Sequence, residues 1–525
     1  MNSVGLEPLV QCWENIKSSF KEIIVFLKTL KICILKKFSI NSKVQLNILL
    51  YVLVGKMKLK ENQILVFIFA IYLISVIFIG AHHEPWFDEA QAWIIARDNS
   101  FVDILKTLST EGHPFNWYYI IKIFQFCGLS YNYLYLVSIF FSALGVYLFL
   151  YKTDFPLLVK ALVPFSYPLF YQYTIVSRSY CLIFPTLMIY SYLYRKYRYS
   201  NPFLIVGALI FLAGISLHTV VLSFILLMLY LVDLFQSKQF SLKVYYSIPF
   251  LIAFYCFTYW YLNIGDRGPI INVSGLFSPD FLYSYCHYVK SLFLMDNEPV
   301  IIGAIFVIVL MFLLFYSFFK SIYKSFLLVI GTLSFYIYFV AIKISLWHTD
   351  LFLIFCIFLF SLYFKEEYKE ISKEKLFYLL FLIILLISAS YSISTSYYDL
   401  KYKYDSSKQI AKMIERSGYI KKKIYAYGFK THAIQVYFDK KIFINAEKTW
   451  WVWNQTMDSQ IYSDIGLYNP DIILYSTYAD NQKVLYDYLE QNNIKYKKMC
   501  LDATMYYKHS GNEENGYCLL FLNEE

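Results

Sequence analysis

Runs of roughly 20 mostly apolar residues recur along this chain, and each run is closed by a short polar break. Of the 525 residues, 58% are hydrophobic and only 16% are charged, a composition that excludes an ordinary soluble or disordered protein. The pattern predicts an all-α polytopic membrane protein. We expect about eleven spans, near residues 63–80, 131–151, 155–173, 179–194, 202–217, 219–235, 244–262, 299–319, 325–342, 347–364 and 376–394.

Lysine and arginine gather in every second polar break. Lys152, Lys160, Arg195 and Lys238 are among the many basic residues of one set of breaks, whereas the other set holds far fewer. Because cytoplasmic loops carry the excess of basic residues, the first run should start in the cytoplasm and residues 81–130 should lie outside. The net charge of +10 then anchors the inner leaflet, and no basic stripe on a soluble segment indicates a nucleic-acid partner.

The two ends of the chain differ from the apolar middle. Residues 1–56 are cationic and amphipathic, which predicts a cytoplasmic extension on the inner membrane face, and the basic start at Met57 leaves open whether they are native. Residues 57–398 form the predicted transmembrane domain. Residues 399–525 have a soluble composition and predict a small exported α/β domain, with helices near 405–417 and 481–492 and strands near 423–427, 471–475, 494–500 and 517–522.

That C-terminal domain carries neither a glycine-rich phosphate loop nor a nucleophile with a recognisable partner. We expect it either to shape the binding of an acceptor or to cap the membrane domain. Cys500 and Cys518 both belong to it, and their presence leaves open whether they pair.

The outer segment 81–130 follows the first apolar run and has helical periodicity. Residues 88–98 and 101–108 predict two short helices in the membrane interface. Residues 116–126 predict a third helix that is too short to cross a membrane. Counting it as a span would invert every later loop and place the basic breaks outside, so we interpret it as interfacial.

Acidic and histidine residues are concentrated in this segment, in His82-His83-Glu84-Pro85-Trp86-Phe87-Asp88-Glu89 and in Glu111-Gly112-His113-Pro114. A carboxylate close to lipid costs several kcal/mol unless it faces water, a partner or a substrate, so such residues are functional candidates. Acidic residues also stabilise the first turn of a helix through its dipole. Asp88 and Glu89 therefore keep two interpretations, catalysis and helix initiation.

The segments Pro85-Trp86-Phe87-Asp88-Glu89-Ala90-Gln91-Ala92-Trp93 and Glu111-Gly112-His113-Pro114, with Ser177-Arg178-Ser179-Tyr180 as a looser third, resemble the GT-C superfamily of membrane glycosyltransferases. Protein O-mannosyltransferases and lipid A aminoarabinose transferases are similar families. The resemblance covers about residues 60–365, and one departure is Phe115, where many relatives carry a second proline. It implies an inverting transfer of a sugar from a polyprenyl-phosphate donor to an acceptor hydroxyl on the outer face of a bacterial cell membrane.

This chemistry suits the residues present. A carboxylate can take the proton of an acceptor hydroxyl, and we assign that role to Asp88, with Glu89 as the second catalytic candidate. The leaving phosphate requires a fixed cation, and Arg178 suits it because guanidinium matches phosphate oxygens, although a basic residue at a span end can also be a simple anchor.

The remaining polar candidates for substrate binding are Glu84, His113, His218 and His348. For the last two, an ordinary interfacial histidine is an equal interpretation. These side chains could also bind a divalent cation, but they lack the spacing of a dedicated metal motif. No other cofactor is indicated.

The expected partners are a polyprenyl-phosphate sugar, membrane lipids and a glycan, lipid or protein acceptor. A transporter or flippase, or a polymerase of lipid-linked saccharides, stays open as an alternative. A transporter should carry charged residues at mid-membrane in paired repeats, whereas here they cluster on one face.

Overall fold

The computed structural model describes residues 61–111, 114–263, 348, 350–371, 375–450, 465–477, 482–507 and 511–523. The chain divides into two units, Met1–Ile64 and Leu65–Glu525, and nearly all of the described residues belong to the second. The predicted extension 1–56 and the predicted spans near 299–319 and 325–342 lie outside the described residues. The described part is mostly helical, and its strands are confined to the C-terminal region, as the sequence predicts.

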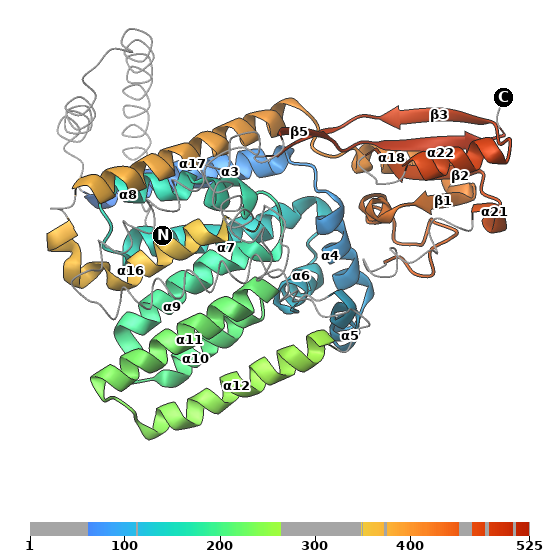
Figure 1. The fold of residues 1–525 in the computed structure, drawn as a ribbon. Helices are drawn as coiled ribbons and strands as arrows, with labels where there is room; N and C mark the ends of the chain where they lie inside the picture. Colours follow the sequence, from blue (N-terminus) through green and yellow to red (C-terminus); the bar gives the residue numbers. More distant parts are fainter. Residues whose placement is uncertain are drawn as a thin grey trace, which may run out of the picture. The chain divides into compact units, whose positions relative to one another are not determined.

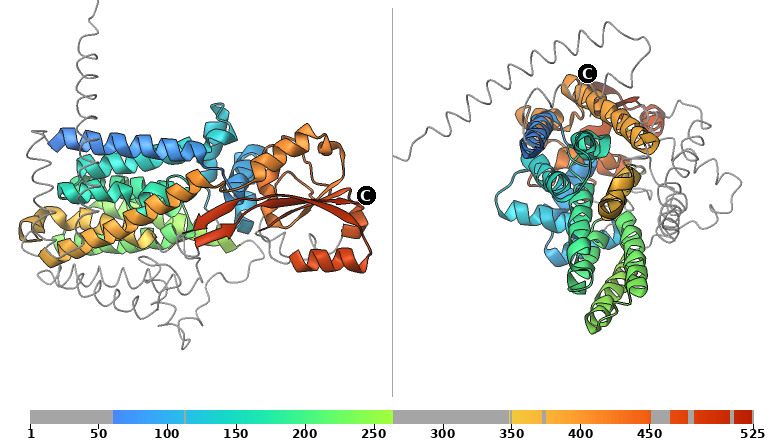
Figure 2. Two further views of the ribbon diagram at one scale, coloured as in Figure 1. Left: turned by 90° about the horizontal axis from the view of Figure 1, so that it is seen from above. Right: turned by 90° about the vertical axis from the view of Figure 1, so that its left-hand side faces the viewer.

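Long helices run side by side in the second unit (Figures 1 and 2). Contacts join α7 to α9, α9 to α10 and α16, and α10 to α11 and α12. Large apolar side chains such as Phe78, Phe140 and Phe235 are exposed on these helices, as is typical of lipid-facing surfaces. The helices are α3 (Glu61–His82), α7 (Leu134–Lys152), α9 (Ile183–Tyr197), α10 (Pro202–Ala213), α11 (Leu217–Ser237), α12 (Leu242–Asn263), α16 (Leu351–Ile371) and α17 (Lys375–Lys401).

Among the described residues, four helical segments are long and apolar enough to cross a membrane: Glu61–His82, Tyr131–Lys152, Leu217–Ser237 and Phe381–Lys401. Each corresponds to a predicted span. Two others are shorter than expected, since α10 ends at Ala213 and the helix predicted from residue 179 begins as a 3₁₀ turn, η4 (Ser179–Leu182), before α9.

The predicted span 155–173 is wrong as a continuous helix. The structure has α8 (Leu157–Leu162), the 3₁₀ turn η2 (Val163–Phe165) and the π-helical η3 (Pro168–Gln172) in its place. Pro164 and Pro168 explain the breaks, because proline lacks the amide hydrogen that a continuous helix needs and its ring clashes with the preceding turn. Apolar composition alone did not reveal this interruption.

Three shorter helices follow α3, and they match the predicted helices of the outer segment closely. They are α4 (Phe87–Asp98), α5 (Phe101–Glu111) and α6 (Asn116–Phe126), and they lie at the end of the bundle where α3 and α12 end (Figure 1). The start of α6 contacts the end of α10, where the backbone N–H of Asn116 donates to the Gly214 carbonyl oxygen at 3.1 Å.

The C-terminal region contains a four-stranded sheet in the order β1-β2-β6-β3, built from β1 (Ile424–Tyr427), β2 (Ile472–Ser476), β3 (Tyr496–Leu501) and β6 (Tyr517–Leu522). Strands β1 and β2 are parallel, and β6 is antiparallel to both β2 and β3. Apolar residues of β1, β2 and β6 form one buried core with Leu485 and Leu489 of α22 (Gln482–Gln491). The region also contains α18 (Ser407–Arg416), the 3₁₀ turns η7 (Tyr419–Lys421) and η8 (Phe429–Thr431), and the short helices α19 (His432–Gln435) and α21 (Ile465–Tyr468).

Two features of this region go beyond the predicted elements. Strands β4 (Thr504–Tyr507) and β5 (Gly511–Glu514) form a separate antiparallel pair that the sequence did not indicate. Cys500 and Cys518 lie directly opposite each other on β3 and β6 and form a disulfide, which the sequence had left open.

Candidate functional site

The site is organised by the first turn of α4. Pro85 and Trp86 precede the helix, and Asp88 and Glu89 occupy its second and third positions, where negative charge is favourable at the positive end of the helix dipole. Neighbouring residues on a helix point about 100° apart. The two acidic side chains therefore meet different surroundings.

Glu89 points into the protein and has no exposed surface. Its Oε1 accepts from the backbone N–H of Ser177 at 2.6 Å, and its Oε2 accepts from the backbone N–H of Trp86 at 3.1 Å. The second bond closes the start of α4, whereas the first fastens α4 to the segment that carries Arg178. These bonds give Glu89 a positioning role. The helix-initiating interpretation thus has structural support for Glu89, which we had also considered as a catalytic residue.

A buried charge cluster lies behind Glu89. His83 Nε2 is 3.4 Å from Glu89, and His83 Nδ1 is 2.9 Å from Asp399 of α17, whose carboxylate also accepts from the Tyr171 hydroxyl at 2.9 Å. Burial disfavours the charged imidazole, but the charges and hydrogen bonds of Asp399 and Glu89 outweigh it and raise the pKa of His83 to about 10. His83 is therefore protonated at neutral pH, and it joins the ends of α3, α4 and α17.

Asp88 lies on the other side of the α4 turn and pairs with Arg178. The Arg178 Nη1 is 2.5 Å from the Asp88 Oδ2, and the two side chains are 23% and 19% exposed. Burial raises the pKa of the Asp88 carboxyl, and the nearby charges of Arg178 and Lys430 oppose this rise. Lys430 belongs to η8 of the C-terminal region, where its ammonium also lies over the Phe87 ring. Sequence analysis did not single out Lys430.

A small cavity of about 30 Å³ opens beside this ion pair. That volume holds roughly one water molecule, so the site is narrow in this structure. Asp88 and Arg178 provide its charged groups, and the rest of the lining is Ala92, Pro114, Trp117, Tyr118, Ser179 and Ile215. His113 precedes Pro114 but lies outside the described residues.

Arg178 also connects to two of the predicted histidines through Tyr180. The guanidinium lies 5.5 Å from the centre of the Tyr180 ring, and the Tyr180 hydroxyl is 2.7 Å from His348 Nε2. The His348 ring stacks on His218 with 4.3 Å between ring centres. Asp88, Arg178, His218 and His348 thus form one connected set, although more than 250 positions separate its first and last members (88 and 348).

Glu84, also a candidate for substrate binding, lies apart from the Asp88–Arg178 pair. It accepts a hydrogen bond from the Gln409 side chain of α18 and does not line the cavity beside Asp88. Burial raises the pKa of the Glu84 carboxyl, and its bond to Gln409 opposes this. Glu84 therefore links the start of α4 to the C-terminal region.

The part of the site that the structure describes shows no ligand set for a divalent cation. Within the described ranges, no group of three or more histidine, cysteine, aspartate or glutamate residues could hold a metal ion. Asp88 has Arg178 as its nearest charged partner, and the Glu89 oxygens are used by backbone donors and His83.

Comparison with known proteins adds no relative: no protein-family model, no curated protein and no solved structure matches this chain.

Proposed function

We propose that this protein is an inverting membrane glycosyltransferase that moves a sugar from a polyprenyl-phosphate donor to an acceptor hydroxyl. The observation that carries this proposal is the Asp88–Arg178 pair, which joins a base and a phosphate-binding cation beside one cavity. The resemblance of the sequence around Asp88 and Arg178 to the GT-C superfamily supports the same assignment. The four described helices that could cross a membrane also support it.

In the proposed reaction, the donor phosphate takes the place of Asp88 on Arg178. A guanidinium pairs with two phosphate oxygens as readily as it pairs with a carboxylate. The exchange therefore frees the carboxylate of Asp88 as the donor enters. Asp88 then removes the proton of the acceptor hydroxyl while the hydroxyl oxygen attacks the anomeric carbon. The bond between that carbon and the phosphate oxygen breaks, its electron pair stays on the phosphate, and Arg178 stabilises the charge.

Burial raises the pKa of the Asp88 carboxyl, and a carboxylate with a higher pKa is a stronger base toward the acceptor hydroxyl. Glu89 and His83 support the reaction by fixing α4 and the Ser177 segment. We further propose about eleven spans, an outward-facing site and a plasma-membrane location, which rest on the distribution of Lys and Arg.

The test separates binding from transfer. Polyprenyl phosphate without a sugar serves as the binding probe, because the sugar is not needed to occupy Arg178. Transfer is measured in membranes with the lipid-linked sugar that accumulates in a deletion strain. Asp88→Asn should reduce transfer by at least roughly 10²-fold, or about 2.7 kcal/mol of barrier, yet bind polyprenyl phosphate at least as tightly as the parent.

Arg178→Gln is the matched variant of the same ion pair. It should weaken binding of polyprenyl phosphate by roughly tenfold or more, because a charge-assisted bond worth about 1.5–3 kcal/mol is lost, and Arg178→Lys should restore part of it. Parental affinity in Arg178→Gln would place the phosphate elsewhere. Parental transfer by Asp88→Asn would end the proposed mechanism.

A further inference from the structure

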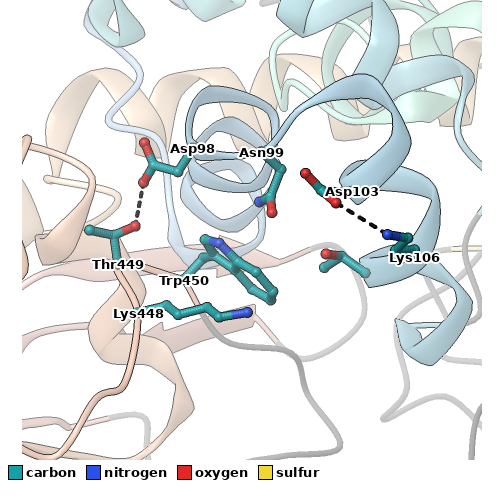
Figure 3. A pocket seen from close by; sticks show the side chains of 8 residues that line it. Asp98, Asn99, Asp103, Lys106, Lys448, Thr449 and Trp450 are labelled. Atoms are coloured by element: carbon teal, nitrogen blue, oxygen red, sulfur yellow. Dashed lines mark hydrogen bonds and ion pairs between the residues drawn. The ribbon is translucent and has the colours of Figure 1, made fainter.

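A second and much larger cavity lies at the opposite end of α4. It has a volume of about 480 Å³, within the range of small-ligand sites. Its walls come from the α4–α5 corner on one side and from residues 448–450 of the C-terminal region on the other (Figure 3). The lining residues are Asp98, Asn99, Asp103, Lys106, Thr107, Lys448, Thr449 and Trp450.

The two walls of this cavity are joined by hydrogen bonds. Arg97 donates to the backbone oxygens of Val436 and Phe438, both at 3.2 Å, and forms an ion pair with Asp98 at 2.7 Å. The Thr449 hydroxyl donates to the same Asp98 carboxylate. The cavity is therefore built by contacts that fix the C-terminal region against α4.

Trp450 is the largest side chain in the lining, and its ring is only partly buried. The Lys448 ammonium lies 4.5 Å from the centre of the ring, and Figure 3 shows the ring between Lys448 and Asn99. An indole in this setting offers a flat apolar surface beside polar groups, which suits a ligand with an apolar face and a polar rim.

The polar groups around Trp450 are balanced in charge. Asp98 is neutralised by Arg97, and Asp103 lies 3.6 Å from Lys106, with both of the latter side chains exposed. Asp103, Lys106 and Lys448 provide hydrogen-bond acceptors and donors with no large excess of either sign. Such a lining suits an uncharged ligand rich in hydroxyl groups better than a phosphate or a carboxylate polymer.

We infer that this cavity binds an uncharged saccharide, which stacks on Trp450 and forms hydrogen bonds with Asp103, Asn99 and Lys448. The role of this saccharide rests on the proposed function, in which it would be part of the acceptor. Asp98 is ten positions after Asp88 on α4, so the cavity lies about 15 Å along the helix from the proposed base. An acceptor of several sugar units could then occupy this cavity while its terminal hydroxyl reaches Asp88.

The experiment uses the purified full chain and an immobilised array of uncharged, acidic and amino-sugar oligosaccharides. The parent should bind at least one uncharged oligosaccharide, and Trp450→Ala should weaken that binding by about tenfold or more. Trp450→Phe should keep part of the affinity, because it retains an aromatic surface. Tyr496→Ala, which removes an exposed aromatic side chain from β3 of the same region, is the control and should bind like the parent.

Asp103→Asn provides a second variant that keeps the size of an exposed side chain, and it should also weaken binding. The inference is overturned if no oligosaccharide binds, or if Trp450→Ala and Asp103→Asn both bind like the parent. It is also overturned if only acidic glycans bind and only Lys448→Gln abolishes that binding. Polyprenyl phosphate binding is measured on the same samples. Loss of saccharide binding in Trp450→Ala with normal phosphate binding would support this cavity independently of the reaction at Asp88.

Discussion

Asp88 and Glu89 are adjacent in the sequence, yet the helix gives them opposite environments. Glu89 is fully buried and satisfies two backbone N–H groups, whereas Asp88 is partly exposed and pairs with Arg178 beside a cavity. A residue whose oxygens are already committed to backbone donors is poorly suited to receive a substrate proton. In the proposed mechanism, this arrangement separates the reacting carboxylate of Asp88 from the positioning carboxylate of Glu89.

Glu89→Gln is the substitution that tests this division. A glutamine offers only one oxygen, so one of the N–H groups of Ser177 and Trp86 would face another donor, and His83 would lose a negative neighbour. A buried donor left without a partner costs about 1–3 kcal/mol. We expect a lower midpoint of thermal unfolding in detergent, together with reduced transfer.

Asp88→Asn is the comparison, since the Asp88–Arg178 pair is partly exposed and its loss should lower the unfolding midpoint less than Glu89→Gln does. If Glu89→Gln instead unfolded like the parent and lost only transfer, Glu89 would act in the chemistry and our assignment of the pair would be reversed.

At the residue scale, the sequence singled out Asp88 and Arg178 because both stand beside apolar runs, and the structure brings them within 2.5 Å of each other. The other contacts of the site were harder to predict. The bond between Glu89 and Ser177 was not predictable, because backbone donors leave no sequence signal. Asp399 was assigned to the C-terminal domain 399–525, so its contact with His83 was also missed. The available signal was an acidic residue near the end of an apolar run.

Helix α4 joins the two cavities, and α6 completes the smaller one. Pro114, Trp117 and Tyr118 line the cavity beside Asp88, and the start of α6 is held by Asn116 against Gly214. A Cβ atom at Gly214 would lie 2.5 Å from the Asn116 Nδ2, which itself donates to the Phe211 carbonyl oxygen at 2.8 Å. The close approach of α6 to α10 thus depends on glycine at this position.

Gly214→Ala should displace the Asn116 side chain and shift α6. Loss of the hydrogen bond from Asn116 to Phe211 costs about 0.5–1.5 kcal/mol, and the shift should also weaken binding of polyprenyl phosphate. Both effects can be measured on the purified protein. Gly207→Ala, inside α10, is the control, because nothing lies within 4 Å of its added methyl group and alanine favours a helix by about 0.5–1 kcal/mol. Equal behaviour of the two variants would contradict the proposed constraint.

At the element scale, helices with clear start signals in the sequence were predictable, and interrupted helices were not. Predicted helices 88–98 and 116–126 match α4 and α6 because proline and polar residues mark their starts. The prediction of a continuous helix at 155–173 was wrong because Pro164 and Pro168 lie within an apolar run whose composition resembles that of a span. Strand β5, with the sequence Gly-Asn-Glu-Glu, has no apolar alternation and so gave no strand signal.

Considering the whole molecule, the C-terminal region contacts both ends of α4. Gln409 reaches Glu84 before the helix, and Lys430 adds its charge to the surroundings of Asp88. Arg97 and Asp98 hold the same region at the far end. The sequence had left open whether this region shapes acceptor binding or caps the membrane domain, and both roles require a region held against α4 in this way.

These contacts also constrain topology. In the proposed membrane topology, α4 and the C-terminal region belong on the same side, because they lie against each other. The distribution of lysine and arginine predicts that this side is the outside. A disulfide between Cys500 and Cys518 agrees with that prediction, since disulfides persist in oxidising compartments.

Cysteine labelling in intact cells tests this orientation. The starting protein retains Cys500 and Cys518 and has its other cysteines replaced by alanine. Val102→Cys, at a position that is 62% exposed on α5, and Glu490→Cys, on the exposed surface of α22, should both react with a membrane-impermeant maleimide. Gln239→Cys, between α11 and α12, should react only after the cells are lysed, because the basic residues on that side belong in the cytoplasm. Labelling of Gln239→Cys in intact cells, with Val102→Cys silent, would place Asp88 and Arg178 on the cytoplasmic face and reverse the proposed side of the reaction.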